Sequence, residues 1–259
     1  MEWCFIDITI IIIILFLAFC CEFLDSSLGM GYGTLMCPIL LLLGFDVFLV
    51  IPSILFSEML TSLSATIFHH EMGNCNLGLK EKNIRVVFLF TILCVITMII
   101  SIIIVLQIPK VFIEIYIGIS IIFVGFVLLF IKSFKFSWKK LEIFSIISAF
   151  NKAISGGGFG PILTTGQIIS GRDAKQAIGV TKAAKFLISI AGFFTFYIIY
   201  GISDYTLLKL LVISGTFAAF FGAFGTSKIK NQSKARFLIG SIAIMLGIII
   251  LVKFMVWRV

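Results

Sequence analysis

Long apolar runs, separated by short charged or turn-forming segments, dominate the chain. A helix needs roughly 20 apolar residues to cross the hydrocarbon core of a bilayer. Runs of about that length occupy 3–24, 47–70, 84–106, 110–131, 176–200, 205–226 and 236–257. They lack the short alternation of apolar and polar residues that marks a transmembrane barrel strand. We therefore predict an all-α polytopic membrane protein without strands.

Two further apolar pieces, 34–44 and 160–171, are too short to cross a bilayer alone. Each follows a cluster of glycines, and the arm before the second cluster, at about 140–155, is short as well. Glycine-interrupted hydrophobic segments in corresponding places are typical of the broken helices of secondary transporters. We expect two helical hairpins, at about 3–44 and 140–171, each broken or re-entrant at its glycines.

The positions of the positive charges predict the orientation of the chain. Lys and Arg concentrate in the segments 80–85, 132–140, 172–175 and 228–236. These loops are cytoplasmic under the positive-inside rule, which places the loops at 44–46, 107–110 and 200–204 and both termini on the outside. The assignment requires each hairpin to return to its own side of the membrane. The two halves of the chain then have opposite orientations.

The two halves also resemble each other in sequence. A shift of 127 residues places GMGYG at 29–33 on GGGFG at 156–160. Other pairs in the same register are Gly44 with Gly171, Asp46 with Asp173, and Ser62 with Ser189. A match at a fixed offset indicates an internal repeat. We predict a first repeat over 1–131 and a second over 132–259, inverted relative to each other and each made of a hairpin and three spans.

The glycine clusters are the predicted substrate region. Glycine adopts positive φ and lets two backbones approach closely, and Pro161 suits the first turn of the helix that follows. Unpaired N–H groups at such a helix start favour an anion. The candidate binding residues at the breaks are Gly29, Gly31, Gly33, Thr34, Ser155, Gly156, Gly157, Gly158, Gly160 and Thr164. Close helix packing without a binding role is the alternative interpretation of these glycines.

Ionisable residues inside the predicted spans are Glu22, Asp25, Glu58, Lys152, Lys182 and Lys185, with Lys209 less deep. Each costs about 2.5 to 3.5 kcal/mol on insertion scales, which makes such residues functional candidates. We predict that Lys152, Lys182 and Lys185 attract the anion, and that Asp25 and Glu58 take up and release a proton during transport. Two alternatives stay open. The 127-residue shift aligns Asp25 with Lys152 and Glu58 with Lys185, so these charges neutralise one another as buried ion pairs, or Lys182 and Lys185 extend to the lipid headgroups.

Composition argues against a soluble protein and against a nucleic-acid partner. The 259 residues are 61% hydrophobic and 12% charged, and the mean hydropathy is +1.22. The formal charge of +8 lies mostly in the loops predicted to be cytoplasmic, so it reflects topology. The N-terminal segment has neither the lysines nor the small-residue cleavage pattern of a signal peptide, and we expect it to be retained.

Signals for metal, cofactor or ATP chemistry are weak. The six cysteines lie mostly in apolar segments without ligand spacing and are interpreted as small hydrophobic residues. The segment HHEMGNC at 69–75 contains His69, His70, Glu71 and Cys75. Adjacent histidines do not share a helix face, so a polar helix end is a better interpretation than a metal site. The sequence contains no nucleophile elbow or P-loop, and we predict neither a cofactor nor enzyme activity.

Two segments resemble the glycine-rich half-repeats of a known family. They are DSSLGMGYGTLMCPILLLLGFDVFLVIPSILFSEMLTS at 25–62 and SGGGFGPILTTGQIISGRDAKQAIGVTKAAKF at 155–186. Over essentially its whole length, the chain resembles the sulfite exporter TauE/SafE (TSUP) family of membrane transporters. The resemblance implies helical segments in two repeats, a plasma-membrane location, and transport of sulfite, sulfonates or related small anions. For many members it also implies coupling to the proton gradient.

The combined prediction is a secondary transporter that moves a small sulfur-containing or carboxylate anion by alternating access, with proton coupling as a further expectation. Its partners are then the anion and the lipid bilayer. An anion channel, in which the glycine loops form a filter open to both sides, is one alternative. A membrane assembly subunit without transport of its own is another. An intramembrane enzyme is disfavoured because the sequence shows no catalytic pair.

Overall fold

Ten helices make up the part of the chain that the structure describes. The computed structural model describes residues 8–78, 82–130, 138–169, 172–202, 204–228 and 232–256. The helices are α1 (Ile8–Leu28), α2 (Tyr32–Leu42), α3 (Val47–Glu71), α4 (Lys82–Val105), α5 (Lys110–Phe130), α6 (Trp138–Ser155), α7 (Phe159–Ile169), α8 (Ala174–Ile199), α9 (Thr206–Lys228) and α10 (Gln232–Val256). Within these ranges there is no strand. The all-α prediction is confirmed.

Six helices are long and apolar enough to cross a membrane, judged over the described residues. They are α1, α3, the Val86–Val105 part of α4, α5, α8 and the Thr206–Thr226 part of α9; α10 contributes a shorter apolar stretch, Phe237–Lys253. Many side chains that point outward from these helices are large and apolar, such as Phe16, Phe123 and Phe217, which are 60–67% exposed. A surface of this kind is stable against lipid and not against water. The chain is a multi-pass membrane protein.

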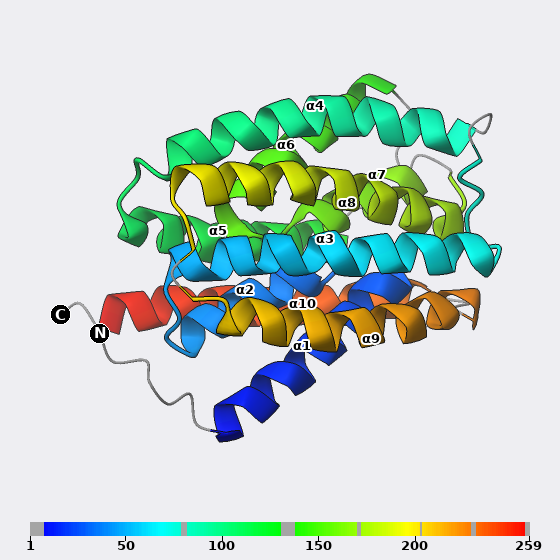
Figure 1. The fold of residues 1–259 in the computed structure, drawn as a ribbon. Coiled ribbons are helices and arrows are strands. Elements are labelled where there is room, and N and C mark those ends of the chain that lie inside the picture. The colour runs from blue at the N-terminus through cyan, green and yellow to red at the C-terminus, as the bar shows by residue number, and fades with distance from the viewer. Residues whose placement is uncertain are drawn as a thin grey trace.

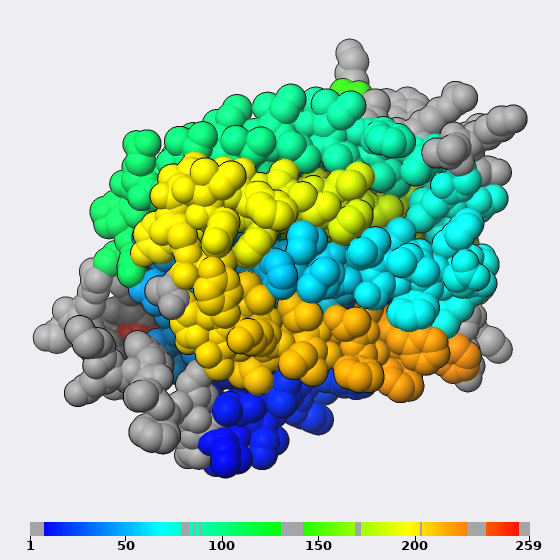
Figure 2. Space-filling view, in the orientation of Figure 1, coloured from blue at the N-terminus to red at the C-terminus, as the bar shows by residue number. Residues whose placement is uncertain are grey.

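The long helices lie roughly side by side, and their connections gather at two ends of the molecule (Figure 1). α1 packs along α9, α3 along α8 and α9, α5 along α10, and α4 along α6 and α8. Figure 2 shows α8, α3 and α9 as neighbours on one face, with α4 above them and α1 below. The connections at 43–46 and 106–109 lie at one end, which we call the Asp46 end. Those at 72–78 and 172–173 lie at the other, the Arg172 end.

Each of the short helices α2 and α7 begins at a glycine break. Gly29 and Gly31 have φ of 74° and 133° between α1 and α2, and Gly156 and Gly158 have φ of 65° and 80° between α6 and α7. Side chains other than glycine rarely adopt these angles, so the glycines are needed for the chain to leave one helix and start the next. α2 and α7 are both 11 residues long and start 127 residues apart. The two breaks thus precede helices of equal length at the same offset as the sequence match.

α1 continues past its predicted end at residue 24 and stops at Leu28. The apolar run at 3–24 ends where the polar residues Asp25, Ser26 and Ser27 begin. The Ser26 hydroxyl donates to Glu22 Oε1 at 2.6 Å, and the Asp25 carboxylate accepts from lysines of α8. A polar turn stays helical in an apolar setting when its side chains have partners inside the protein. The first five residues of the predicted span, 3–7, lie outside the described residues.

Candidate substrate site

The two glycine breaks touch each other in the middle of the protein. A Cβ atom added to Gly33 would lie 2.8 Å from the Gly157 Cα atom, and one added to Gly157 would lie 2.6 Å from the Thr34 nitrogen. One added to Gly160 would lie 2.5 Å from the Gly29 carbonyl oxygen. Any side chain at Gly33, Gly157 or Gly160 would collide with backbone atoms of the other break. Close packing therefore explains why these three positions are glycine. Packing and binding do not exclude each other here, because this contact brings both breaks to one place.

The start of α7 differs from the sequence prediction of unpaired N–H groups. The Gly158 N–H donates to the Thr34 hydroxyl at 3.0 Å, and the Gly157 N–H lies 3.2 Å from the Ser155 hydroxyl. These two donors already have partners, so the expectation of free donors at the second break is wrong for them. The reason is tertiary, because Thr34 comes from α2. Buried backbone donors are nearly always paired in native structures.

Beside the breaks, six buried ionisable side chains form one chain of alternating charge. In order they are Glu22, Lys182, Asp25, Lys185, Glu58 and Lys152. The Nζ–O distances are 2.7 Å for Lys182–Glu22, 2.5 Å for Lys182–Asp25, 2.8 Å for Lys185–Asp25 and 3.0 Å for Lys185–Glu58, and Lys152 pairs with the other Glu58 oxygen. Every member is at most 3% exposed at its side chain. With three carboxylates and three lysines, the chain is electrically balanced.

Four helices supply this charge chain. Glu22 and Asp25 lie three residues apart on α1, and Lys182 and Lys185 have the same spacing on α8, so each pair shares one helix face. Glu58 comes from α3, and Lys152 from the end of α6 just before its break. Glu22 is a member of this site that was not among the binding or proton-carrying residues predicted from the sequence. The matching spacing of the two acids and the two lysines was the signal that could have found it.

The structure distinguishes the alternatives for the lysines. Lys182 and Lys185 are 0% and 2% exposed and point at carboxylates, so they do not extend to the lipid headgroups. Glu58 pairs with Lys185, its counterpart at the 127-residue shift. Asp25 pairs with Lys182 and Lys185, and Lys152 pairs with Glu58, so the second suggested pair, Asp25 with Lys152, does not form a direct contact. The charges neutralise one another, but along a chain and not in two isolated pairs.

Several hydroxyls near the charge chain have no hydrogen-bond partner among the described residues. Ser62 follows Glu58 by one helical turn, and Ser189 follows Lys185 by one turn; both are fully buried and without a partner in that part of the chain. The Oε2 atom of Glu22 is also buried without a hydrogen-bond partner among the described residues. A buried polar group without a partner costs about 1 to 3 kcal/mol. Ser62 and Ser189 are therefore candidate hydrogen-bond donors to a small oxyanion at this place.

The three hydroxyl residues predicted from the sequence to bind the anion, Thr34, Ser155 and Thr164, form hydrogen bonds at the glycine breaks. The Thr164 hydroxyl lies 2.9 Å from the Gly29 carbonyl oxygen and 3.0 Å from the Thr181 hydroxyl. Ser155 donates to the Asn151 carbonyl at 2.7 Å. Thr34 and Thr164 thus join the two breaks, whereas Ser155 bonds within α6 and the second break.

The His69 segment has a structural role. His69 is buried, its Nε2 atom lies 2.9 Å from the Ser26 carbonyl oxygen, and its Nδ1 atom lies 3.3 Å from the Asn74 amide. Both ring nitrogens therefore have protein partners and tie the end of α3 to the end of α1. Within the described residues, no group of three or more His, Cys, Asp or Glu side chains has an arrangement that could hold a metal ion.

Comparison with known proteins assigns the chain to a family. A family model described as sulfite exporter TauE/SafE matches residues 14–250, which include both glycine breaks and all six members of the charge chain. No curated protein and no solved structure matches the chain. The family consists of membrane transporters and not of enzymes. The chain therefore belongs to the sulfite exporter TauE/SafE family and is a membrane transport protein.

Proposed function

We propose that the protein is a secondary transporter of small anions that works by alternating access, with its substrate site where the two glycine breaks meet the charge chain. The substrate class is sulfite, a sulfonate or another small organosulfur or carboxylate anion. The observation that carries the proposal is the row of three buried lysines, Lys152, Lys182 and Lys185, beside the breaks. A buried ammonium group binds an oxyanion strongly because water does not compete with it.

The balanced charge chain suggests how an anion binds. In the described conformation each lysine is occupied by a carboxylate of the protein, which stands where the oxygens of a bound anion would be. An entering anion replaces one carboxylate at a lysine, and the displaced carboxylate then takes up a proton. The negative charge of the anion is offset by that proton, so no uncompensated charge stays in the protein interior, where it would cost several kcal/mol.

Asp25 and Glu58 are the proposed proton carriers in this scheme. Each contacts two lysines, so each can leave one lysine to the anion while it stays beside the other. Lys152 lies near the end of α6, four residues before Gly156 at the second break, and Glu58 is its ion-pair partner. Transport of an anion together with a proton would draw its energy from the proton gradient.

The directions of the helices support alternating access. In Figure 1, α3 runs from the Asp46 end to the Arg172 end, and α8, which packs against it, runs the opposite way. α5 and α10, which also pack against each other, run in opposite directions as well. Two halves of opposite orientation can exchange conformations, which opens the site to one side and then to the other. We further propose a plasma-membrane location with both termini outside the cytoplasm.

An anion channel is the second candidate, and burial argues against it. All six members of the charge chain are shut off from solvent, and their charges are used in ion pairs. A channel filter exposes its binding groups to both sides and binds its ion weakly enough to release it quickly. The flux through proteoliposomes distinguishes the two, since a transporter saturates at a rate set by conformational cycling.

The primary test is ligand binding by the purified protein in detergent. Sulfite, thiosulfate, sulfonates and carboxylates are screened for a rise in the melting temperature. A ligand at about 100 times its Kd stabilises the folded state by about 2.7 kcal/mol. The expected result is a rise with one anion class in the wild-type protein, its loss in Lys152→Met, and its retention in Lys209→Met, which makes the same change at an exposed lysine. A response that persists in Lys152→Met would remove this lysine from the site.

Proton coupling is tested separately in proteoliposomes. Replacing Asp25 by Asn keeps the size of the side chain but removes the acid. We expect anion flux that no longer responds to an imposed pH gradient. If flux in Asp25→Asn responds to the gradient as in the wild-type protein, Asp25 has a structural role only.

A further inference from the structure

A file of hydrogen-bonded polar side chains leads from the first glycine break toward the Arg172 end. Thr164 contacts the Gly29 carbonyl oxygen and the Thr181 hydroxyl, and the Gln167 amide donates to the same Thr181 hydroxyl at 3.0 Å. The Gln167 Oε1 atom in turn accepts from the Arg172 guanidinium at 3.0 Å. Thr164, Gln167 and Thr181 are fully buried, whereas Arg172 is partly exposed. The file thus joins the interior to the molecular surface.

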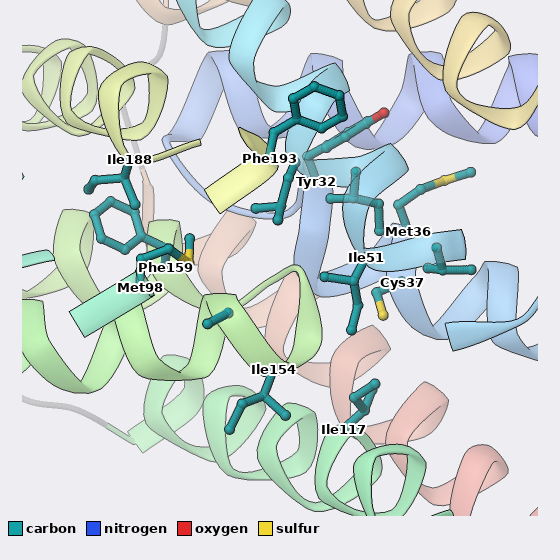
Figure 3. Packing of buried hydrophobic residues seen from close by; sticks show 14 of the residues in the cluster. Tyr32, Met36, Cys37, Ile51, Met98, Ile117, Ile154, Phe159, Ile188 and Phe193 are labelled. Atoms are coloured by element: carbon teal, nitrogen blue, oxygen red, sulfur yellow. The ribbon is translucent and has the colours of Figure 1, made fainter. Parts of the chain in front are cut away.

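The equivalent positions at the other end of the protein are apolar. A shift of 127 residues relates Thr164 to Cys37, Gln167 to Leu40, Arg172 to Phe45 and Thr181 to Ile54. These four residues are 0–7% exposed and belong to the main apolar core. Figure 3 shows Cys37 in that core, close to Met36 and Ile51. The four positions of the polar file are therefore polar in the second half of the chain and apolar in the first half.

Arg172 is suited to be the outermost residue of the polar file. Its guanidinium donates to two neutral amide oxygens, Gln167 Oε1 and Asn83 Oδ1, and among the described residues it forms no ion pair with a carboxylate. Hydrogen bonds between a guanidinium and an oxyanion are roughly twice as strong as those to neutral acceptors. An anion with two oxygens can therefore replace both amides at once.

We propose that the polar file from Arg172 through Gln167 and Thr181 to Thr164 is the route by which the anion reaches the charge chain, and that packed apolar side chains close the Asp46 end. Arg172 is then a positioning residue that holds this end shut through Asn83 and Gln167 and is the first group to meet the anion. The inference rests on the proposed function, because it names the access path of the same site.

The surface ion pair at the Asp46 end does not have the corresponding role. Lys110 pairs with Asp46 there, and both side chains are more than 40% exposed. Exposed ion pairs contribute little to stability. Closure at that end is due to the core residues around Cys37, so loss of the pair leaves the closure intact.

Native cysteines at the two ends allow a test that does not depend on transport. Cys75 is 1% exposed, and its Sγ atom lies 3.7 Å from the Asn83 amide, directly behind the partner of Arg172. Cys37 is one of the four apolar residues that correspond to the polar file, and it lies in the main apolar core. Two variants that each keep only Cys75 or only Cys37 are purified in detergent and treated with a neutral methanethiosulfonate, and the modification rate is followed by mass spectrometry.

Arg172→Ala should raise the modification rate of Cys75 at least tenfold and leave that of Cys37 unchanged. The matched control Lys110→Ala removes a paired basic residue from the other end and should change neither rate. Equal rates for Cys75 with and without Arg172 would overturn the inference. A parallel rise at Cys37 would do so too, because it would show general loosening of the fold.

Flux measurements connect the file to transport. Gln167→Leu introduces the residue found at position 40 and should lower anion flux in proteoliposomes at least tenfold. Gln107→Leu makes the same change at an exposed position and should not. Wild-type flux in Gln167→Leu would refute the access route and leave the proposed function standing. Absence of anion flux in the wild-type protein would refute the proposed function itself.

Discussion

The balance of the buried charge chain leads to a prediction about stability. Lys152→Met removes the lysine at one end of the chain and leaves three carboxylates with two lysines. Loss of one partner of a buried ion pair typically costs about 3 to 5 kcal/mol, because the other charge stays buried without compensation. For a protein of this size, that corresponds to a fall in melting temperature of about 6 to 20 °C. The fall is measured by thermal denaturation of the purified protein in detergent.

A second substitution should reverse most of this loss. Adding Glu58→Gln to Lys152→Met leaves two carboxylates, Glu22 and Asp25, with two lysines, Lys182 and Lys185, and these four keep their mutual contacts. Replacing both members of a buried ion pair by uncharged residues is often close to neutral. We therefore expect the double variant to melt near the wild-type temperature.

The exposed pair at the Asp46 end provides the matched control. Lys110→Met and Asp46→Asn, singly and together, should each change stability by less than about 1 kcal/mol through loss of the ion pair. The reasoning is refuted if the double variant of Lys152 and Glu58 is no more stable than Lys152→Met alone. That result would mean that the cost of Lys152→Met comes from lost packing and not from an uncompensated buried carboxylate.

Three further predictions concern the breaks and the Arg172 end. Gly157→Ala should abolish the yield of folded protein because its Cβ would lie 2.6 Å from a backbone nitrogen, whereas Gly225→Ala, whose nearest neighbour lies at 3.5 Å, should not. Thr34→Val leaves the Gly158 N–H without its acceptor and should cost about 1 to 3 kcal/mol in thermal denaturation, with no change in melting temperature as the contrary result. Burial raises the pKa of Cys75 to about 11, so its reaction with a neutral thiol reagent should accelerate about tenfold per pH unit from pH 7 to 10; a rate independent of pH would contradict this.

The features of this structure that depend on local properties of the chain are predictable from the sequence. Apolar length predicts the spanning helices, and glycine at positions of positive φ predicts the breaks before α2 and α7. The apolar run ended at residue 24, whereas α1 extends to Leu28, because Ser26 has a partner on α1 and Asp25 has partners on α8. The prediction of unpaired donors was wrong for the Gly158 N–H, because its acceptor, Thr34, comes from a helix more than 100 residues away.

For this protein, the amino-acid sequence alone is enough to predict the class, the two glycine breaks 127 residues apart, and which ionisable residues lie within the apolar helices. These follow from the length of apolar runs, from backbone freedom, and from the identity of individual residues. Which lysine contacts which carboxylate depends on how the helices pack. Lys182 reaches Glu22 across 160 residues of chain, and Lys152 reaches Glu58 across 94. A long, flexible lysine side chain has several acids within reach, and the packing of α1, α3, α6 and α8 selects among them.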